Sequence, residues 1–374
     1  MPLPLVAITM GDPAGIGPEI IAKAWRSPAL LASCRPVVIG HPDVMLSAAA
    51  MLNDRRLVVA EVASVDELRA STDVMPCLKA TADNVSVIPP AKVDPRGGQA
   101  AFDALKVAAE LAISGKVDAI VTAPLHKAAL HAAGHHYPGH TEMLADFCGV
   151  PASEVAMMLY LAPGEMIKGR AGLGVAHVTL HMALKDVFAH LTQERILASC
   201  RLAETVMRAL VGQVSNLSLT VSGQVENLSY VPRIGVAALN PHAGEEGIFG
   251  DEECRIIVPA VEAGRAQGLD LTGPLPCDTL MVRAAAGEFD AVVAMYHDQG
   301  HIALKLLGMH RAVNISLGLP IIRTSVAHGT AFDVAWQRKA DCSSMIEAVR
   351  VAAQLVAARK WLNWRPNGQT AALR

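Results

Sequence analysis

Polar side chains follow three short aliphatic runs of this sequence, at the point where each run ends. The runs and the side chains after them are Val117–Thr122 with His126 and Lys127, Ile234–Leu239 with Asn240 and His242, and Phe289–Tyr296 with His297 and Asp298. In open α/β sheets, ligands bind outside the carboxyl ends of the strands, so we expect these side chains to converge on one site. Of the 14 histidines, only His41 lies outside residues 126–328, which favours a site over scattered surface polarity.

A histidine-rich site with oxygen donors nearby suits zinc or a related divalent ion, because neutral imidazole is the commonest metal ligand. The spacing His177-x-x-x-His181 would fit two ligands on a helix, but Gly174–Thr179 has the pattern of a strand. We therefore favour His181, which follows this strand, over His177 within it. Any one histidine taken alone could instead be a satisfied turn residue.

The first aliphatic run, Leu5–Met10, leads into the glycine-rich segment Gly11–Glu19. With Pro18 at a helix start and glycines in the turn, this strand-to-helix entry could face an anion, or it could be a tight turn only. It does not match the G-x-G-x-x-G pattern of dinucleotide-binding folds, and that pattern is absent from the chain.

Continuous rather than alternating apolar residues in these runs are typical of strands covered on both faces, as in parallel sheets. Helical patterns lie elsewhere: Gln99–Gly115 carries an apolar stripe of period 3.6, and Ser343–Leu362 opens on possible serine caps. Strands that alternate with helices predict an α/β fold, and a length of 374 residues predicts two domains.

Composition excludes several classes of protein. Hydrophobic residues make up 52% and charged residues 18%, so disorder is excluded as the main state. Because 32 basic residues face 35 acidic ones and aromatics are only 4%, we expect no nucleic-acid partner. Seven cysteines without a C-x-x-C pair indicate reduced thiols, and no apolar run is long enough for a membrane span. We expect a cytoplasmic protein without a secretion signal.

One segment is nearly repeated: GQVSNLS at 212–218 returns as GQVENLS at 223–229. Two copies are too few for a solenoid, so we interpret residues 212–229 as a duplicated loop or an added hairpin of unassigned role.

Taken together, the motifs resemble the 4-hydroxythreonine-4-phosphate dehydrogenase family of vitamin B6 biosynthesis. The matching stretches are ITMGDPAGIGPE (8–19), VTAPLHK (121–127), GHTE (139–142), LNPHAGE (239–245), GPLPCDTL (273–280), AMYHDQGHIALK (294–305) and VNISLGLPIIRTS (313–325). The resemblance implies an isocitrate/isopropylmalate dehydrogenase-like fold of two α/β/α domains with a cleft between them. We expect residues 1–145 and 326–374 in the first domain, and 146–325, with the metal ligands and the dimer interface, in the second.

The resemblance also implies a homodimer whose active site is shared between subunits. A divalent ion would be held by three histidines contributed by both partners, here His181, His242 and His297. The family's substrate contacts map onto His140, Thr141, Lys305, Asn314 and Arg323. Lys305 and Arg323 would supply fixed cations for a phosphate group.

The chemistry of alcohol oxidation agrees with this family. The alcohol must lose its proton while negative charge on oxygen is stabilised, which a metal does as a Lewis acid, and NAD accepts the hydride. We expect zinc, or magnesium, cobalt or manganese, and a decarboxylation after the oxidation. Asp278, Asp298 and Lys127 are the candidate catalytic residues; each Asp could be a proton acceptor, a partner of a ligand histidine or an ordinary helix cap.

For NAD, the segment from His328 and Gly329 to Asp333 resembles the adenosine-binding loop of isopropylmalate-type dehydrogenases. An aspartate there accepts hydrogen bonds from ribose hydroxyls and repels a 2′-phosphate, which favours NAD over NADP. The chain departs from the family pattern at Ala327 and Trp336.

The substrate is less constrained than the reaction. Some motifs are closer to a family branch that acts on D-threonate or D-erythronate 4-phosphate, and a further branch oxidises dihydrodiol dicarboxylates of the terephthalate type. An alternative of another class is a metal-dependent hydrolase that uses the same histidines to activate water.

Overall fold

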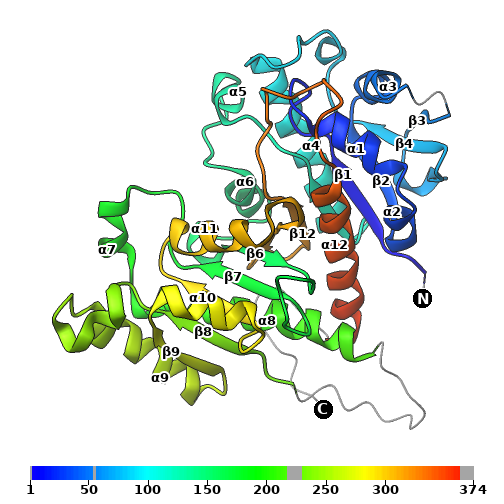
Figure 1. The fold of residues 1–374 in the computed structure, drawn as a ribbon. Coiled ribbons are helices and arrows are strands. Elements are labelled where there is room, and N and C mark those ends of the chain that lie inside the picture. The colour runs from blue at the N-terminus through cyan, green and yellow to red at the C-terminus, as the bar shows by residue number, and fades with distance from the viewer. Residues whose placement is uncertain (1, 54–55, 217–229, 363–374) are drawn as a thin grey trace. The chain divides into compact units, whose positions relative to one another are not determined.

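The computed structural model describes residues 2–53, 56–216 and 230–362. The chain divides into two compact units, one formed by Met1–Val155 with Leu319–Ala357 and the other by Ala156–Gly318. Each unit combines strands with helices (Figure 1), which confirms the predicted α/β class. In the part of the chain that the structure describes, no helix is both long and apolar enough to cross a membrane.

The strands of the first unit lie in the order β3-β4-β2-β1-β5-β12 and are all parallel. They are β1 (Leu5–Thr9), β2 (Arg35–Gly40), β3 (Val58–Val62), β4 (Val74–Lys79), β5 (Ala119–Thr122) and β12 (Arg323–Val326). Because the strands are parallel, the carboxyl ends of β1, β5 and β12 meet at one edge of the sheet. That edge carries the polar segments of this unit.

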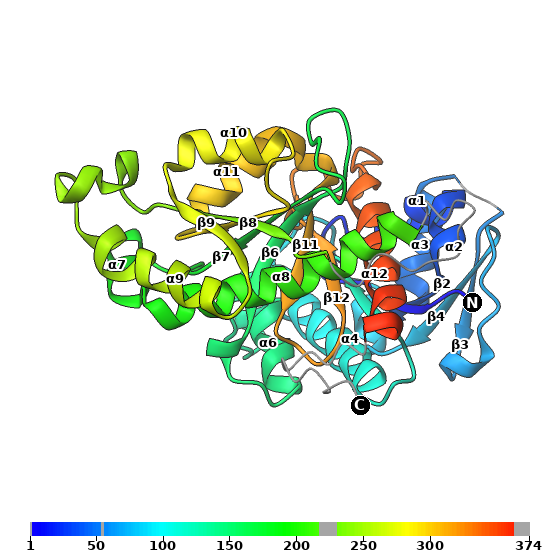
Figure 2. The same ribbon diagram turned by 90° about the horizontal axis from the view of Figure 1, so that it is seen from below.

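Helices cover both faces of this sheet. They are α1 (Gly17–Trp25), α2 (Pro28–Ser33), α3 (Pro42–Met51), α4 (Pro95–Ile113), α5 (Lys127–Ala132), α6 (His140–Phe147) and α12 (Ser343–Leu362). Figure 2 shows α4 and α6 on one face and α1 and α3 on the other. The start of α4 is fixed by Asp94, whose side chain accepts the Arg96 N–H, and by Pro95 in the first turn. The apolar face of α4 packs on β1, β2 and β5 through residues such as Leu105 and Ile120.

The second unit contains strands in the order β11-β6-β7-β10-β8-β9. They are β6 (Ala156–Leu161), β7 (Leu173–His177), β8 (Arg233–Ala237), β9 (Asp270–Leu275), β10 (Ala291–Ala294) and β11 (Val313–Leu317). Strands β7, β10, β8 and β9 are parallel, but β6 runs antiparallel to both β7 and β11. The runs predicted as strands of a parallel sheet include β7, β8 and β10, which are parallel to one another; β6, which was not predicted, is the strand that runs antiparallel.

Helices of the second unit are α7 (Val187–His190), α8 (Gln193–Asn216), α9 (Val258–Ala266), α10 (Cys277–Ala285) and α11 (His297–Gly308). Figure 2 shows α10 and α11 on one face of the strands and α8 and α9 on the other. The first copy of the repeated sequence begins inside α8, so residues 212–216 are helical rather than a loop. The rest of the repeat, residues 217–229, lies outside the described residues.

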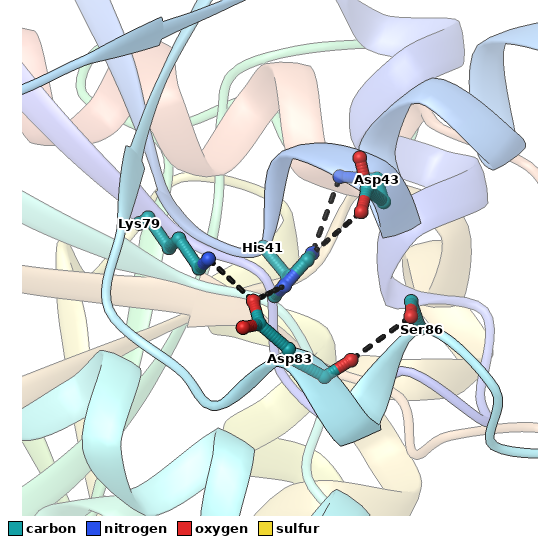
Figure 3. A network of polar contacts seen from close by, with 5 residues as sticks. All are labelled: His41, Asp43, Lys79, Asp83 and Ser86. Atoms are coloured by element: carbon teal, nitrogen blue, oxygen red, sulfur yellow. Dashed lines mark hydrogen bonds and ion pairs between the residues drawn. The ribbon is translucent and has the colours of Figure 1, made fainter.

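His41, the histidine far from the others in sequence, has a structural role. It is 2% exposed and caps α3, where its Nδ1 accepts the Asp43 N–H at 3.2 Å. The opposite nitrogen, Nε2, therefore carries the proton and donates to Asp83 Oδ1 at 3.3 Å, and Lys79 pairs with the same carboxylate (Figure 3). These contacts tie the carboxyl ends of β2 and β4 to the start of α3.

Candidate functional site

Two of the three polar segments predicted to converge follow neighbouring strands of the second unit. Strand β10 pairs with β8 on one side and β7 on the other, all parallel. His181, His242 and His297 follow β7, β8 and β10 respectively, so all three come after the same edge of the sheet. The third polar segment, with His126 and Lys127, follows β5 and belongs to the first unit.

His297 is the first residue of α11 and is oriented by its neighbour. Its Nδ1 lies 2.6 Å from Asp298 Oδ1, so this nitrogen carries the proton and donates to the carboxylate, leaving Nε2 available as a metal ligand. The His181 and His297 ring centroids are 5.9 Å apart. An imidazole nitrogen binds zinc at about 2.0–2.1 Å, so two rings on one ion have centroids roughly 5–6 Å apart. This pair therefore fits two ligands of a divalent ion.

A second pair of histidines lies buried beside His297. His301 stacks on His297 with ring centroids 3.7 Å apart, and its Nδ1 lies 3.0 Å from His177 Nε2. His177 Nδ1 faces the Met157 carbonyl oxygen at 3.4 Å, so Nδ1 carries the proton and Nε2 accepts from His301. Burial lowers the pKa of both imidazoles, to about 3 for His301, and keeps them neutral. The sequence analysis omitted His301, although its position four residues after His297 places both on one helix face.

His242 lies in a loop with unusual backbone geometry. The five residues from His242 to Glu246 all have positive φ, between 43° and 77°, and only Gly244 among them is a glycine. A left-handed conformation costs about 1–2 kcal/mol for each residue with a side chain, so surrounding contacts must hold this loop. The Phe249 ring lies 6.3 Å from the His242 ring between centroids.

No three His, Cys, Asp or Glu side chains among the described residues of one chain gather closely enough to hold a metal ion. The structure therefore brings His181 and His297 together but does not add His242 to them within this chain. The expected sharing of ligands between two subunits is compatible with this arrangement.

The first unit contains a buried cation whose side chain reaches the last residue of β5. Arg323, the first residue of β12, is 3% exposed and donates from Nη2 to Thr122 Oγ1 at 2.5 Å. Burial lowers the pKa of Arg323 to about 9, and the carboxylate of Glu142 partly opposes this shift. His140, which opens α6, has its pKa held well below the usual range by burial and by the positive charge of Arg323. His140 is therefore neutral beside a guanidinium.

This neighbourhood fits an anion. A phosphate oxygen would add negative charge next to this guanidinium, which already interacts with the Glu142 carboxylate. His140 and Thr141 occupy the first turn of α6, where backbone N–H groups and the helix dipole also favour negative charge. His140 and Arg323 interact electrostatically, and Thr141 follows His140 in α6. Lys305, on α11, and Asn314, on β11, belong to the second unit.

The predicted adenosine loop packs on the glycine-rich turn after β1. Ile16 N–H donates to the Thr330 carbonyl at 3.1 Å, and the indole N–H of Trp336 donates to the Pro13 carbonyl at 2.9 Å. At its start, His328 Nε2 lies 2.9 Å from Ser344 Oγ. Trp336, a departure from the family pattern, therefore anchors the loop to this turn.

The residues of this loop fit a nucleotide. The Asp333 side chain is exposed, so its carboxylate is accessible to ribose hydroxyls, and a β-carbon built on Gly329 would meet no atom within 4 Å. Phe332 stacks on His126 with centroids 4.6 Å apart, which holds the centre of the loop against the segment after β5.

The glycine-rich turn itself is not an anion site. Asp12 and Glu19 are buried in it with 1% and 0% exposure, and they would repel a phosphate. Asp12 Oδ1 accepts the Ala14 N–H at 2.9 Å, and Glu19 Oε1 pairs with Lys23 at 3.0 Å. The alternative of a tight structural turn is the one that the structure supports.

The remaining candidate catalytic residues have separate surroundings. Asp278 lies in the first turn of α10 and accepts the N–H of the next residue, Thr279, at 2.8 Å. Lys127 is the first residue of α5 and its side chain is exposed.

A cavity of about 210 Å³ lined by Arg35 and Arg69 lies at the amino ends of β1 and β2, at the opposite edge of the sheet from the polar segments.

The sequence is similar to a known protein family and to characterised relatives. A family model described as "Pyridoxal phosphate biosynthetic protein PdxA" matches residues 32–352. The chain is 44% identical over 364 residues to D-threonate 4-phosphate dehydrogenase of Cupriavidus necator, covering 96% of this chain and 98% of the relative.

Two solved structures are also similar. One is 4-hydroxythreonine-4-phosphate dehydrogenase from Klebsiella pneumoniae, with a TM-score of 0.78 and 41% identity over 94% of this chain and 99% of that one. The other is terephthalate 1,2-cis-dihydrodiol dehydrogenase from Burkholderia xenovorans LB400, with a TM-score of 0.60 and 28% identity over 94% and 98% of the two chains.

Proposed function

The chain belongs to the pyridoxal phosphate biosynthetic protein PdxA family, and on this premise we propose that it is a dehydrogenase of a 4-phosphorylated hydroxy acid. The proposed substrates are D-threonate or D-erythronate 4-phosphate, or 4-hydroxythreonine 4-phosphate. The observation that carries the proposal is the buried Arg323 guanidinium beside the first turn of α6, which suits a phosphate group. In this proposal a secondary alcohol is oxidised and the resulting β-keto acid loses carbon dioxide.

Arg323 and α6 would bind the end of the substrate remote from the reacting carbon. The guanidinium donates in a fixed fork that matches two phosphate oxygens, and Thr141 adds a hydroxyl donor. His140 is neutral, so one ring nitrogen donates and the other accepts. Binding energy gained at the phosphate positions the reacting carbon. Lys305 and Asn314 are proposed as further substrate contacts from the second unit.

We propose His181, His242 and His297 as the ligands of a divalent metal, zinc or one of magnesium, cobalt and manganese. The bound metal would supply Lewis-acid stabilisation of negative charge on the substrate oxygen. Asp298 accepts the Nδ1 proton of His297 and so presents Nε2 in its basic form. Asp278 and Lys127 remain candidates for proton transfer, and both are accessible.

NAD is the proposed hydride acceptor, held by the loop of His328, Gly329 and Asp333. NAD supplies the oxidising group for the alcohol carbon. The exposed Asp333 carboxylate would accept from the ribose hydroxyls, and the contacts of Trp336 and Phe332 fix the loop that carries it.

A homodimer with a shared site is part of this proposal. Of the three proposed ligands, all within the described residues, one chain brings His181 and His297 together, so the third ligand would come from the partner subunit. Ile302, Leu306 and Met309 are 57%, 82% and 49% exposed and lie on one side of α11 and the turn after it, the helix that begins with His297. Such a stripe of exposed apolar side chains suits burial in a subunit interface. Sedimentation of the active enzyme as a monomer would contradict the shared site.

The test is a substrate panel followed by NADH absorbance, with and without a chelator. The three phosphorylated hydroxy acids are compared with a cis-dihydrodiol dicarboxylate, because the 28% identity with the terephthalate enzyme favours this second candidate and Arg323 would also bind a carboxylate. Chelator-sensitive NADH formation from a phosphorylated acid supports the proposal. NADH formation from the dihydrodiol dicarboxylate alone would contradict the proposed substrates and favour the dihydrodiol dehydrogenase activity. A metal-dependent hydrolase would show no stabilisation by NAD in a thermal-shift assay.

A further inference from the structure

Glu253 has the contacts of a residue that fixes the loop carrying His242. Glu253 is the first residue of the π-helical turn Glu253–Ile257, which precedes α9, and it is 2% exposed. Its Oε1 accepts the backbone N–H groups of Leu239 and Asn240, both at 2.8 Å, directly after β8. Its Oε2 accepts from the Asn240 amide at 3.0 Å. One buried carboxylate therefore receives three hydrogen bonds from the start of the loop.

The far side of the loop rests on the same carboxylate. A β-carbon built on Gly244 would lie 2.7 Å from Glu253 Oε2 and 2.9 Å from the Gly250 carbonyl oxygen. Gly244 is the centre of the left-handed run from His242 to Glu246. The glycine is therefore required both by its backbone angle and by its close approach to Glu253. The carboxylate contacts the loop before and after His242.

The strain in this run calls for an explanation. His242, Ala243, Glu245 and Glu246 adopt a conformation that side chains disfavour, and such strain persists only where the surroundings impose it. Strained segments of this kind cluster at functional sites. The strained residue with ligand chemistry here is His242, and the group that contacts its loop from both sides is Glu253.

We propose that Glu253 is a positioning residue, which holds the 239–250 loop and thereby sets the direction of the His242 imidazole for metal binding. This inference rests on the proposed metal-dependent function. Glu253 does not bind the metal itself; it acts through the backbone of the loop. Loss of the carboxylate would let the loop leave its left-handed conformation, and the His242 ligand would then be lost from its position.

The test compares Glu253→Gln with Glu262→Gln, an exposed glutamate on α9, in the full-length chain. In Glu253→Gln the amide keeps one acceptor for the two backbone N–H groups but places a donor against the Asn240 amide. In metal-free protein, hydrogen exchange of the Leu239 and Asn240 amides should accelerate at least about tenfold in Glu253→Gln and stay unchanged in the control. Unchanged exchange in Glu253→Gln overturns the proposal.

The second measurement is zinc affinity by calorimetry. Glu253→Gln should bind zinc about 10- to 100-fold more weakly than the wild-type protein, the usual cost of removing support from a ligand. In a His242→Ala background the same substitution should cost no further affinity, because the ligand it positions is gone. If Glu253 has a purely structural role, Glu253→Gln should lower zinc affinity equally in the wild-type and His242→Ala backgrounds, or in neither of them. Either result overturns the proposal.

A second variant approaches the contact from the other side. Gly244→Ala presses a methyl group against Glu253 Oε2, and the neighbouring Ala243 shows that alanine also adopts a positive φ in this run, at 56° against 77° for Gly244. The zinc affinity of Gly244→Ala should fall by a similar factor to that of Glu253→Gln. This variant therefore tests the proposal even if Glu253→Gln cannot be purified. If the wild-type protein binds no zinc, the proposed metal function fails; if it does and neither variant differs from it, only the role of Glu253 fails.

Discussion

Replacement of Asp12 by Asn is expected to stabilise the protein at neutral and alkaline pH. Asp12 lies in the turn after β1 and is 1% exposed. Its Oδ1 accepts the Ala14 N–H, but its Oδ2 is buried without a hydrogen-bond partner among the residues that the structure describes. Burial, reinforced by the charge of Asp94, raises the pKa of Asp12 from 3.8 to about 6, although the Ala14 N–H opposes the shift. The ionised form is therefore costly in the folded protein.

The sign and size of the effect follow from this pKa. The folded protein binds the proton more tightly than the unfolded chain, so the cost is fully present above pH 6 and is relieved as the pH falls from about 6 to 3.8. At about 1.36 kcal/mol per pKa unit, a shift of about two units corresponds to roughly 3 kcal/mol. Asn keeps the acceptor for Ala14 and cannot ionise. Asp12→Asn should raise the unfolding free energy by about 1–3 kcal/mol at pH 8, and by about half as much near pH 5.

Urea unfolding at pH 8 and pH 5 measures this difference, with Asp186→Asn as the control because Asp186 is exposed. The control should change the unfolding free energy little at either pH. If Asp12→Asn is less stable than the wild-type protein at pH 8, or gains equally at both pH values, then burial of an ionised Asp12 is not the source of the cost.

Four further predictions concern the proposed site and the packing of α4. Arg323→Ala should lower kcat/KM for a phosphorylated substrate by about 30-fold or more, since losing one partner of a buried charge pair costs about 2–5 kcal/mol, and unchanged initial rates would contradict the phosphate site. His297→Ala should carry no bound metal in elemental analysis, and chelation should inactivate the wild-type enzyme; full turnover by the variant would show that the ligand set is wrong. The wild-type enzyme should prefer NAD to NADP by about 10- to 100-fold in kcat/KM, and Asp333→Ala should narrow this ratio, whereas equal values in the wild-type enzyme would exclude the role of Asp333. Gly98→Ala places a β-carbon 2.1 Å from the Ala129 carbonyl oxygen, between α4 and α5, and should lower stability by about 1–3 kcal/mol in thermal unfolding; an unchanged Tm would show that the two helices can separate without cost.

Local sequence was sufficient to predict several elements. The strands predicted at Leu5–Met10, Val117–Thr122, Gly174–Thr179, Ile234–Leu239 and Phe289–Tyr296 appear as β1, β5, β7, β8 and β10, each slightly shorter or shifted. The helix predicted at Ser343–Leu362 is observed with the same bounds. These elements have continuous aliphatic runs or a helical period, which are properties of neighbouring residues alone. Strands β2, β3, β4, β6, β9, β11 and β12 were not predicted. Proline, glycine, charged or polar residues interrupt most of these runs, although β6 is continuously apolar.

The tertiary structure decided what the site residues contact. The pairing of His301 with His177 joins residues 124 positions apart, and Arg323 meets Thr122 across 201 positions. Their types indicated chemistry in the sequence, and motif resemblance gave the family that the comparisons confirm. Nothing in the sequence near Asp12 or Glu253 distinguished a buried carboxylate from an exposed one. Burial, and with it the raised pKa of Asp12 and the hydrogen bonds of Glu253, arises only when distant segments pack together and exclude water from a charged group.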